Sequence, residues 1–479
     1  MEGRWSVLTV TTIGIFMASL DASLLVVGLP VVINELGADL ATGSWLITIY
    51  RLAITILLVP IGRLGDMYGR VRLYSIGYFI FALSSLLCAL SSDIYQLLIF
   101  RSIQGVGGAL MFVNSMAIVT DAFAGRGLGL GIGINQIAIN AGTVIGYTLS
   151  GVVISLYGWR ALFLINIPIG VFGGFWARLR LKETNPSLRV ERFDFTGAII
   201  FSTSLILLML GLTSGAITSS IPLSLIITSL ILLTLFIIVE KNIVYPMLDF
   251  KLFKIRTFTA GNISNLLNGL SFASLAFLIS VYLEIVAGFS PIQAGLSLIP
   301  LELTLILIGP VSGWLSDKIG ARMLSTAGLI ATAIALIILS NISINLDYNM
   351  LLIGLVMAGL GVGLFRSPNA SSVMGSVPSE MRGVAAGVRS TIINTSMALS
   401  IPFSVAIIST TVPSSESSKL INSGRSDMES LSQITDLVQG IRNSLLASAV
   451  LNIIAAVISY LREENVNHHS VESYISSSK

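Results

Sequence analysis

The stretch GRLGDMYGRVR, residues 62–72, lies between two long apolar runs, and GWLSDKIGAR, residues 313–322, repeats its pattern. Both copies follow the second apolar run of their half of the chain. The shared positions are Gly62/Gly313, Leu64/Leu315, Asp66/Asp317 and Gly69/Gly320, and Arg72 is offset by one from Arg322. A match at four fixed positions in corresponding places predicts that a helical unit has been duplicated within the chain.

The composition places these units in lipid. Of the 479 residues 54% are hydrophobic and only 11% are charged, and the mean hydropathy is +0.90. A soluble domain cannot hide so much apolar surface. Fourteen apolar stretches are long enough, at about 17–25 residues each, to cross a bilayer. They are residues 8–28, 43–61, 74–91, 95–119, 128–152, 161–178, 194–213, 221–240, 258–283, 293–312, 325–341, 350–372, 386–411 and 443–461.

We therefore predict an all-α integral membrane protein with two six-helix bundles and two inserted helices. The N-terminal bundle covers residues 1–185, the inserted linker helices 186–248, and the C-terminal bundle 249–479. The last bundle includes a serine-rich external loop at 412–442 and a polar tail. When the N-terminus is placed in the cytoplasm, most of the 27 basic residues fall in cytoplasmic segments. This asymmetry predicts that both termini of a multi-pass cell-membrane protein are cytoplasmic.

Several motifs resemble the major facilitator superfamily, specifically its fourteen-helix drug/proton antiporter branch. They are LDASLLVVGLP (20–30), GRLGDMYGR (62–70), RSIQGVGGAL (101–110), WRALFLINIPIG (159–170) and SPNASSVMGSVPSEMRGVAAG (367–387). The resemblance implies a secondary active transporter that works by alternating access. It also implies proton-coupled efflux of hydrophobic, cationic small molecules, with the proton gradient as energy source and no cofactor.

Asp21, Arg101 and Gln104 are predicted to couple protons to transport. Asp21 lies about 20 Å from the cytoplasmic end of the first span, and Arg101 and Arg51 lie at a similar depth. Ionisable groups at such a depth are costly unless they find a partner or face a cavity. We expect Asp21 to pair with Arg101 or Arg51, with Gln104 orienting the guanidinium, so that protonation of Asp21 releases the arginine. The alternative is a fixed ion pair that only holds helices together.

Other polar and aromatic residues within the spans are candidates for the substrate cavity. Glu302, near the middle of the tenth span, fits a cationic substrate, a second proton site or a local salt bridge. Arg51 is an added anion-binding group or a competing partner of Asp21. Tyr50 is a candidate aromatic contact. Tyr147 stands where the antiporter branch has a proline, which favours the alternative of a facilitator or importer of a polar metabolite.

The repeated loops are predicted to form a gate. The candidate gating residues are Gly62, Asp66, Gly69, Arg70, Asp317 and Arg322. The glycines permit a tight turn and close approach of helices. Asp66 is expected to face a helix N-terminus or a basic partner, where a negative charge is favoured. The loop would then act as a latch on the inner gate.

Other classes of function are poorly supported. Glycine-rich runs such as GVGGAL lie inside apolar helices, without the strand and exposed helix start of a nucleotide-binding loop. No nucleophile–base set is evident, and Cys88 is the only cysteine. His468 and His469 lack the further ligands of a metal site. We therefore predict that the chain is not an enzyme. The expected partners are small molecules, protons and the lipid bilayer, without nucleic acid, and the expected state is a monomer. A non-transporting membrane sensor on the same scaffold is the remaining alternative.

Overall fold

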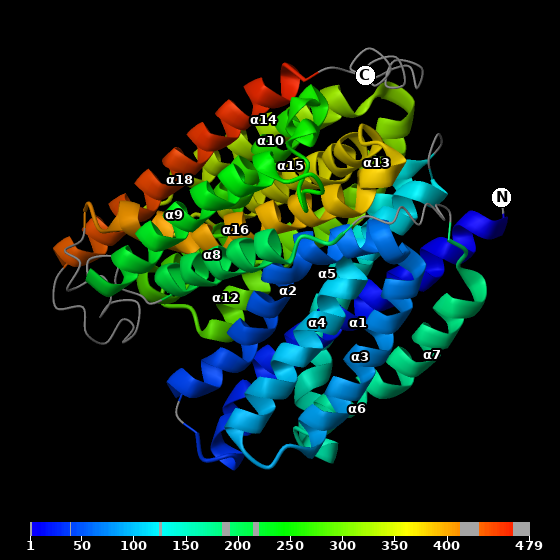
Figure 1. Cartoon of the computed structure of the whole chain (residues 1–479). Helices are drawn as coiled ribbons and strands as arrows, with labels where there is room; N and C mark the ends of the chain where they lie inside the picture. Colours follow the sequence, from blue (N-terminus) through cyan, green and yellow to red (C-terminus); the bar gives the residue numbers. More distant parts are fainter. Residues whose placement is uncertain are drawn as a thin grey trace. The chain divides into compact units, whose positions relative to one another are not determined.

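The computed structural model describes residues 2–38, 40–123, 127–183, 192–213, 220–411 and 431–462, and these are almost entirely helical (Figure 1). Within the described ranges, 13 helices are long and apolar enough to cross a membrane, and Phe195–Gly211 is a shorter apolar helix. The described part of the chain contains no strand. The predicted all-α membrane fold is therefore confirmed.

The chain divides into two compact units. Among the described residues, unit 1 contains those up to Ile255 together with Met374–Thr391, and unit 2 contains Arg256–Val373 and those from Ile392 to Arg462. The bundle boundaries predicted above remain a prediction. The first residues of helix α16 (Arg382–Ile408) belong to unit 1, although most of that helix belongs to unit 2.

Unit 1 is built from paired long helices. Its helices are α1 (Glu2–Glu35), α2 (Leu40–Tyr68), α3 (Arg70–Leu90), α4 (Ile94–Ala122), α5 (Leu128–Tyr157), α6 (Ala161–Leu164), α7 (Asn166–Arg180), α8 (Phe195–Thr213), α9 (Ser220–Asn242), η1 (Phe250–Lys254) and η3 (Ser379–Met381). α1 packs along α5, α4 packs along both α2 and α3, and α8 packs along α9. Part of the predicted linker, residues 184–191, lies outside the described residues.

Unit 2 contains the remaining helices. They are α10 (Arg256–Phe272), α11 (Leu275–Val281), the π-helical turn η2 (Tyr282–Val286), α12 (Pro291–Ser297), α13 (Ile299–Ile319), α14 (Ala321–Leu339), α15 (Tyr348–Gly375) and α18 (Leu431–Tyr460). The predicted span 258–283 is thus divided, as is 293–312. The last helix begins at Leu431, so the prediction of an external loop is wrong for residues 431–442. Residues 412–430 lie outside the described residues.

The internal repeat is visible in the backbone. Gly69, between α2 and α3, has φ +102°, and Gly320, between α13 and α14, has φ +91°. Residues with a Cβ rarely adopt these angles, so each turn requires its glycine. The helices that follow also pack alike: a Cβ added at Gly107 would lie 3.0 Å from the carbonyl oxygen of Gly77, and one added at Gly361 would lie 2.8 Å from that of Gly328.

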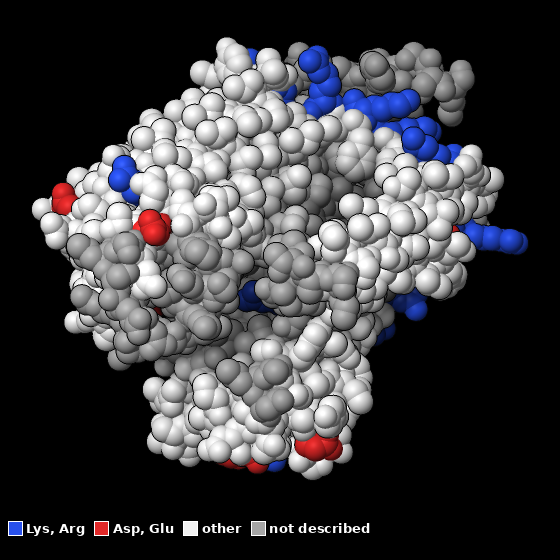
Figure 2. Space-filling view, turned by 90° about the vertical axis from the view of Figure 1, so that its left-hand side faces the viewer, with Lys and Arg blue, Asp and Glu red and all other residues white. Residues whose placement is uncertain are grey.

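The surface suits a lipid environment. Charged side chains are sparse on the face drawn in Figure 2, which has broad uncharged areas. On α13, Leu303, Leu307 and Val311 are each more than half exposed and recur every four residues, so they form one apolar stripe. Together with the many long apolar helices, this stripe is that of a multi-pass membrane protein.

Candidate functional site

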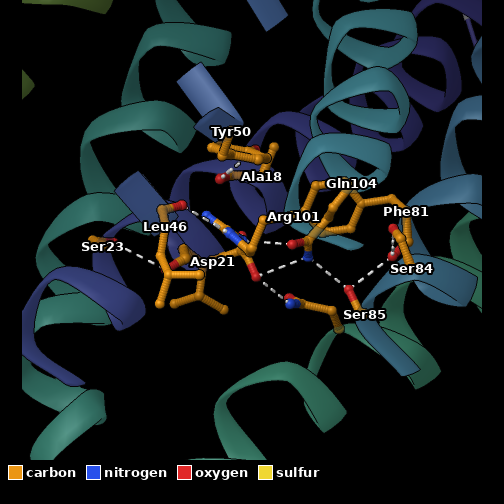
Figure 3. Close-up of polar contacts among 12 residues, drawn as sticks. Ala18, Asp21, Ser23, Leu46, Tyr50, Phe81, Ser84, Ser85, Arg101 and Gln104 are labelled. Carbon is orange, nitrogen blue, oxygen red and sulfur yellow. Dashed lines mark hydrogen bonds and ion pairs between the residues drawn. The ribbon is translucent and has the colours of Figure 1, made fainter. Parts of the chain in front are cut away.

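A buried ion pair occupies the interior of unit 1. Asp21 of α1 is 2% exposed and Arg101 of α4 is 1% exposed. Arg101 Nη1 donates to Asp21 Oδ2 over 2.6 Å, and Arg101 Nε donates to the carbonyl oxygen of Leu46 over 3.3 Å (Figure 3). A second bond of Arg101 Nη1 goes to Gln104 Oε1. Of the two arginines predicted as partners of Asp21, the structure selects Arg101.

Two side-chain amides complete the environment of the carboxylate. Asp21 Oδ1 accepts from Gln104 Nε2 over 3.0 Å and from Asn166 Nδ2 over 2.7 Å. Gln104 Nε2 also donates to Ser85 Oγ over 2.7 Å. Residues from α1, α4 and α7 therefore meet at this carboxylate, and Ser85 of α3 is joined to it through Gln104. These hydrogen bonds offset the cost of removing both charges from water, which is several kcal/mol per ion.

The aromatic ring of Tyr50 covers the guanidinium. It lies 4.3 Å from Arg101 Cζ, and the ring of Phe163 lies 5.8 Å away. Tyr50 is 2% exposed, and its hydroxyl donates to the carbonyl oxygen of Ala18 over 3.4 Å. A cation attracts the face of an aromatic ring, most strongly where water is excluded. Tyr50 therefore belongs to the buried cluster and does not line an open cavity, contrary to the prediction.

The two other cavity candidates in unit 1 lie apart from this cluster. Arg51 is exposed, because consecutive helical residues point about 100° apart and Tyr50 takes the inward direction. Among the described residues Arg51 has no ion pair, so it does not compete for Asp21. Tyr147 of α5 is 46% exposed.

A second cluster forms around Asp66, near the end of α2. Its Oδ1 accepts from the backbone N–H of Gly383, and its Oδ2 from that of Val384, both over 2.9 Å. These amides belong to the first turn of α16, whose N–H groups have no partner within the helix and carry partial positive charge. Gly62 makes the approach possible, because a Cβ there would collide with the carbonyl oxygen of Gly383.

Alternating charges extend this second cluster. Arg70 forms ion pairs with Asp66 and with Asp121 of α4, and it donates to the carbonyl oxygen of Ser379. Arg382 Nη1 donates to the other oxygen of Asp121 over 2.7 Å. Asp66, Arg70, Asp121 and Arg382 thus form one chain of charges that joins α2, α3 and α4 to the start of α16.

The second copy of the loop has different surroundings. Asp317 is exposed, whereas Asp66 is buried. Arg322 lies over the ring of Tyr460, 4.5 Å from its centroid. Glu302 of α13 is also exposed, and the charge that attracts it is that of Arg366 on α15.

Sequence reasoning missed two residues of these clusters. Asn166 stands inside the apolar run LFLINIPIG, where an uncharged amide is easily taken for filler. Asp121 is the only acidic residue of α4, and that isolation at the end of an apolar helix was a usable signal. Among the described residues, no group of three or more His, Cys, Asp or Glu side chains is placed to hold a metal.

Comparisons with known proteins agree with this fold. The sequence profile of the Major Facilitator Superfamily matches residues 11–242 and 261–476. The riboflavin transporter RibZ of Clostridioides difficile is 33% identical over 84% of this chain and 88% of its own. The multidrug resistance protein Stp of Mycobacterium tuberculosis is 30% identical over 80% of this chain and 72% of its own. The quinolone resistance protein NorB of Staphylococcus aureus is 29% identical over 81% and 84%.

Solved structures share the architecture at low sequence identity. The proton:xylose symporter XylE superposes with a TM-score of 0.65 at 14% identity, over 97% of both chains. The human organic anion transporter MFSD10 superposes with a TM-score of 0.64 at 18% identity, over 95% of this chain and 99% of its own. At these identities the likeness establishes the fold alone.

Proposed function

We propose that this chain, which belongs to the Major Facilitator Superfamily of membrane transporters, is a proton-coupled exporter of hydrophobic, cationic small molecules. It would act by alternating access as a monomer in the cell membrane, with both termini in the cytoplasm. The proton gradient would supply the energy without a cofactor. The observation that carries the proposal is the buried pair of Asp21 and Arg101.

Protonation of Asp21 is the proposed coupling step. The carboxylate is held by one guanidinium and two amides, all of which donate hydrogen bonds to it. A proton on Asp21 removes the charge that compensates Arg101. Leaving one member of a buried ion pair uncompensated costs about 3–5 kcal/mol. A rearrangement that gives Arg101 a new partner or water would relieve that cost.

The cluster around Asp66 is the proposed latch. It joins α2, α3 and α4 to the first turn of α16 through backbone and side-chain bonds. These bonds share side chains, because Asp121 and Arg70 each bridge two partners. Such a set of contacts suits an element with two discrete arrangements, which alternating access requires.

The substrate class is supported by named relatives. Stp and NorB are resistance proteins for multiple drugs and for quinolones. A second candidate, uptake of a polar metabolite, is favoured by the riboflavin transporter, which is 33% identical over most of both chains. The exposed Arg51 suits a polar or anionic substrate better than a cationic one.

Flux through reconstituted protein tests the proposal. Proteoliposomes with an imposed pH gradient are loaded with ethidium, a hydrophobic cation, or with riboflavin. Gradient-driven ethidium movement supports proton-coupled export, whereas gradient-independent equilibration of riboflavin supports the second candidate. Asp21→Asn should abolish gradient-driven accumulation and retain exchange of ethidium across the membrane. Wild-type coupling in that variant would refute the assignment of Asp21.

A further inference from the structure

We propose that Arg366, Glu302 and Phe272 form a substrate subsite within unit 2 that takes an amphoteric aromatic molecule. The acidic group of the molecule would bind Arg366, its amino group Glu302, and its ring would lie beside Phe272. This inference rests on the proposed transport function, because it takes the bound molecule to be the one transported.

Arg366 is a cation without a bonding partner deep in a membrane helix. It lies nine residues before the end of α15 at Gly375, or about 14 Å from that end. Its side chain is partly buried, and within the described residues it makes no hydrogen bond or ion pair. The centroid of the Phe272 ring lies 5.5 Å from Arg366 Cζ. The negative charge of Glu302 attracts the guanidinium. A guanidinium offers five N–H donors that require acceptors.

Close packing of α15 on α13 fixes the backbone next to Arg366. A Cβ added at Gly359 would lie 2.5 Å from the carbonyl oxygen of Leu301, and one at Gly363 would lie 2.9 Å from Ile308 Cβ. Ser312 Oγ donates to the carbonyl oxygen of Gly363 over 2.7 Å. Arg366 follows Gly363 by three residues and so extends from nearly the same face of α15. The backbone that carries the guanidinium is therefore rigidly placed.

Glu302 supplies the opposite charge without neutralising Arg366. It follows Leu301, whose carbonyl oxygen lies beside Gly359 of α15, and its charge interacts with that of Arg366. Glu302 is exposed and has no hydrogen bond or ion pair in the described structure. Helical side chains lean towards the N-terminus of their helix, so Arg366 reaches towards the level of Glu302.

Two charges of opposite sign, one of them beside an aromatic ring, indicate the class of ligand. A carboxylate or similar acid pairs with guanidinium by charge-assisted hydrogen bonds, and a primary amine pairs with the carboxylate of Glu302. Phe272 is only 8% exposed, and its ring centroid lies 5.5 Å from Arg366 Cζ. The surroundings of the guanidinium are therefore partly aromatic and favour an aromatic ligand. A purely cationic drug would satisfy Glu302 and leave Arg366 unpaired, so an amphoteric molecule should bind best.

Equilibrium binding to the purified full-length protein in detergent tests the subsite. The probes are Nε-dansyl-lysine and dansylcadaverine, which share ring, chain and amine and differ only in the carboxylate. Wild-type protein should bind dansyl-lysine more tightly. Arg366→Gln should weaken dansyl-lysine at least about tenfold, as expected for one lost charged hydrogen bond, and leave dansylcadaverine unchanged. Glu302→Gln should weaken both probes.

Matched controls separate recognition from folding. Arg442→Gln, which removes the same charge from α18 of unit 2, should leave both affinities unchanged, and Arg366→Lys should retain part of the preference. The proposal is overturned if wild-type protein does not distinguish the probes, including by binding neither, or if Arg366→Gln weakens both equally. Because this assay needs no pH gradient, a failure of proton coupling would leave its result intact.

Discussion

Replacing Asp66 by alanine should release the first turn of α16. The carboxylate accepts from the N–H groups of Gly383 and Val384, each over 2.9 Å. Losing a capping side chain usually costs about 1 kcal/mol, and a buried N–H left without an acceptor costs about 1–3 kcal/mol. For the two bonds together we expect the free energy that opens this turn to fall by about 2–4 kcal/mol.

Hydrogen–deuterium exchange measures that opening directly. A loss of about 2–4 kcal/mol corresponds to amide exchange at residues 383 and 384 that is about 30- to 700-fold faster. The core of unit 1 should keep its protection, because Arg70 retains its ion pair with Asp121.

A matched control removes a comparable bond elsewhere. Asp249→Ala deletes a carboxylate that accepts from the N–H of Lys251 over 2.8 Å at the start of η1. It should leave exchange at residues 383 and 384 unchanged. If Asp66→Ala also leaves those two amides as slow as in the wild type, Asp66 does not hold the turn, and the latch argument fails.

Substitutions at Gly383, Tyr50 and Asn166 probe packing and burial. Gly383→Ala should destabilise the protein by about 1–3 kcal/mol, because the added Cβ would meet a backbone carbonyl of α2. The control Gly151→Ala, where a Cβ has open space, should be neutral. Equal melting temperatures of the two variants in detergent would contradict this prediction. Tyr50→Phe keeps the ring over Arg101 and should lower the free energy of unfolding by under about 1 kcal/mol, whereas Tyr50→Ala should lower it by about 3–5 kcal/mol. Chemical denaturation measures both values. An equal loss in the two variants would exclude ring stacking. Asn166→Leu removes a 2.7 Å bond to the buried carboxylate and should cost about 1–3 kcal/mol by thermal melting, whereas an unchanged melting temperature would show that the amide is dispensable.

The sequence was sufficient to predict the fold because lipid imposes a simple rule. Each span must be long, apolar and helical, so hydropathy locates it. The duplicated glycine–aspartate loops then locate the two matching turns at Gly69 and Gly320. Hydropathy failed where a helix continues beyond its apolar part. The residues from Leu431 to Arg442 mix polar and apolar side chains, and they form the first turns of α18.

The sequence predicted the charged residues of the candidate site but not the side chains that each of them contacts. Depth along the helices placed Asp21, Arg51 and Arg101 at one level, but depth does not specify which way a side chain points around its helix. The 100° step between Tyr50 and Arg51 decides that the ring, and not the guanidinium, enters the cluster. Asn166 was missed because its role depends on a contact between residues 145 positions apart.

The sequence also could not predict that Asp66 and Asp317 have different surroundings. The two aspartates occupy the same position of the repeat, so pattern alone treats them as equivalent. In the structure Asp66 is buried against two amides and Arg70, while Asp317 is exposed. The two copies of the motif therefore differ in burial although their sequence pattern is the same.

Proton release on substrate binding tests the central claim most directly. Ethidium is added to purified protein in weakly buffered detergent solution that contains a pH indicator. If Asp21 exchanges its proton for the ion pair with Arg101, the wild type should release protons when ethidium binds, and Asp21→Asn should bind ethidium without releasing any. Equal proton release by the two proteins would contradict the account.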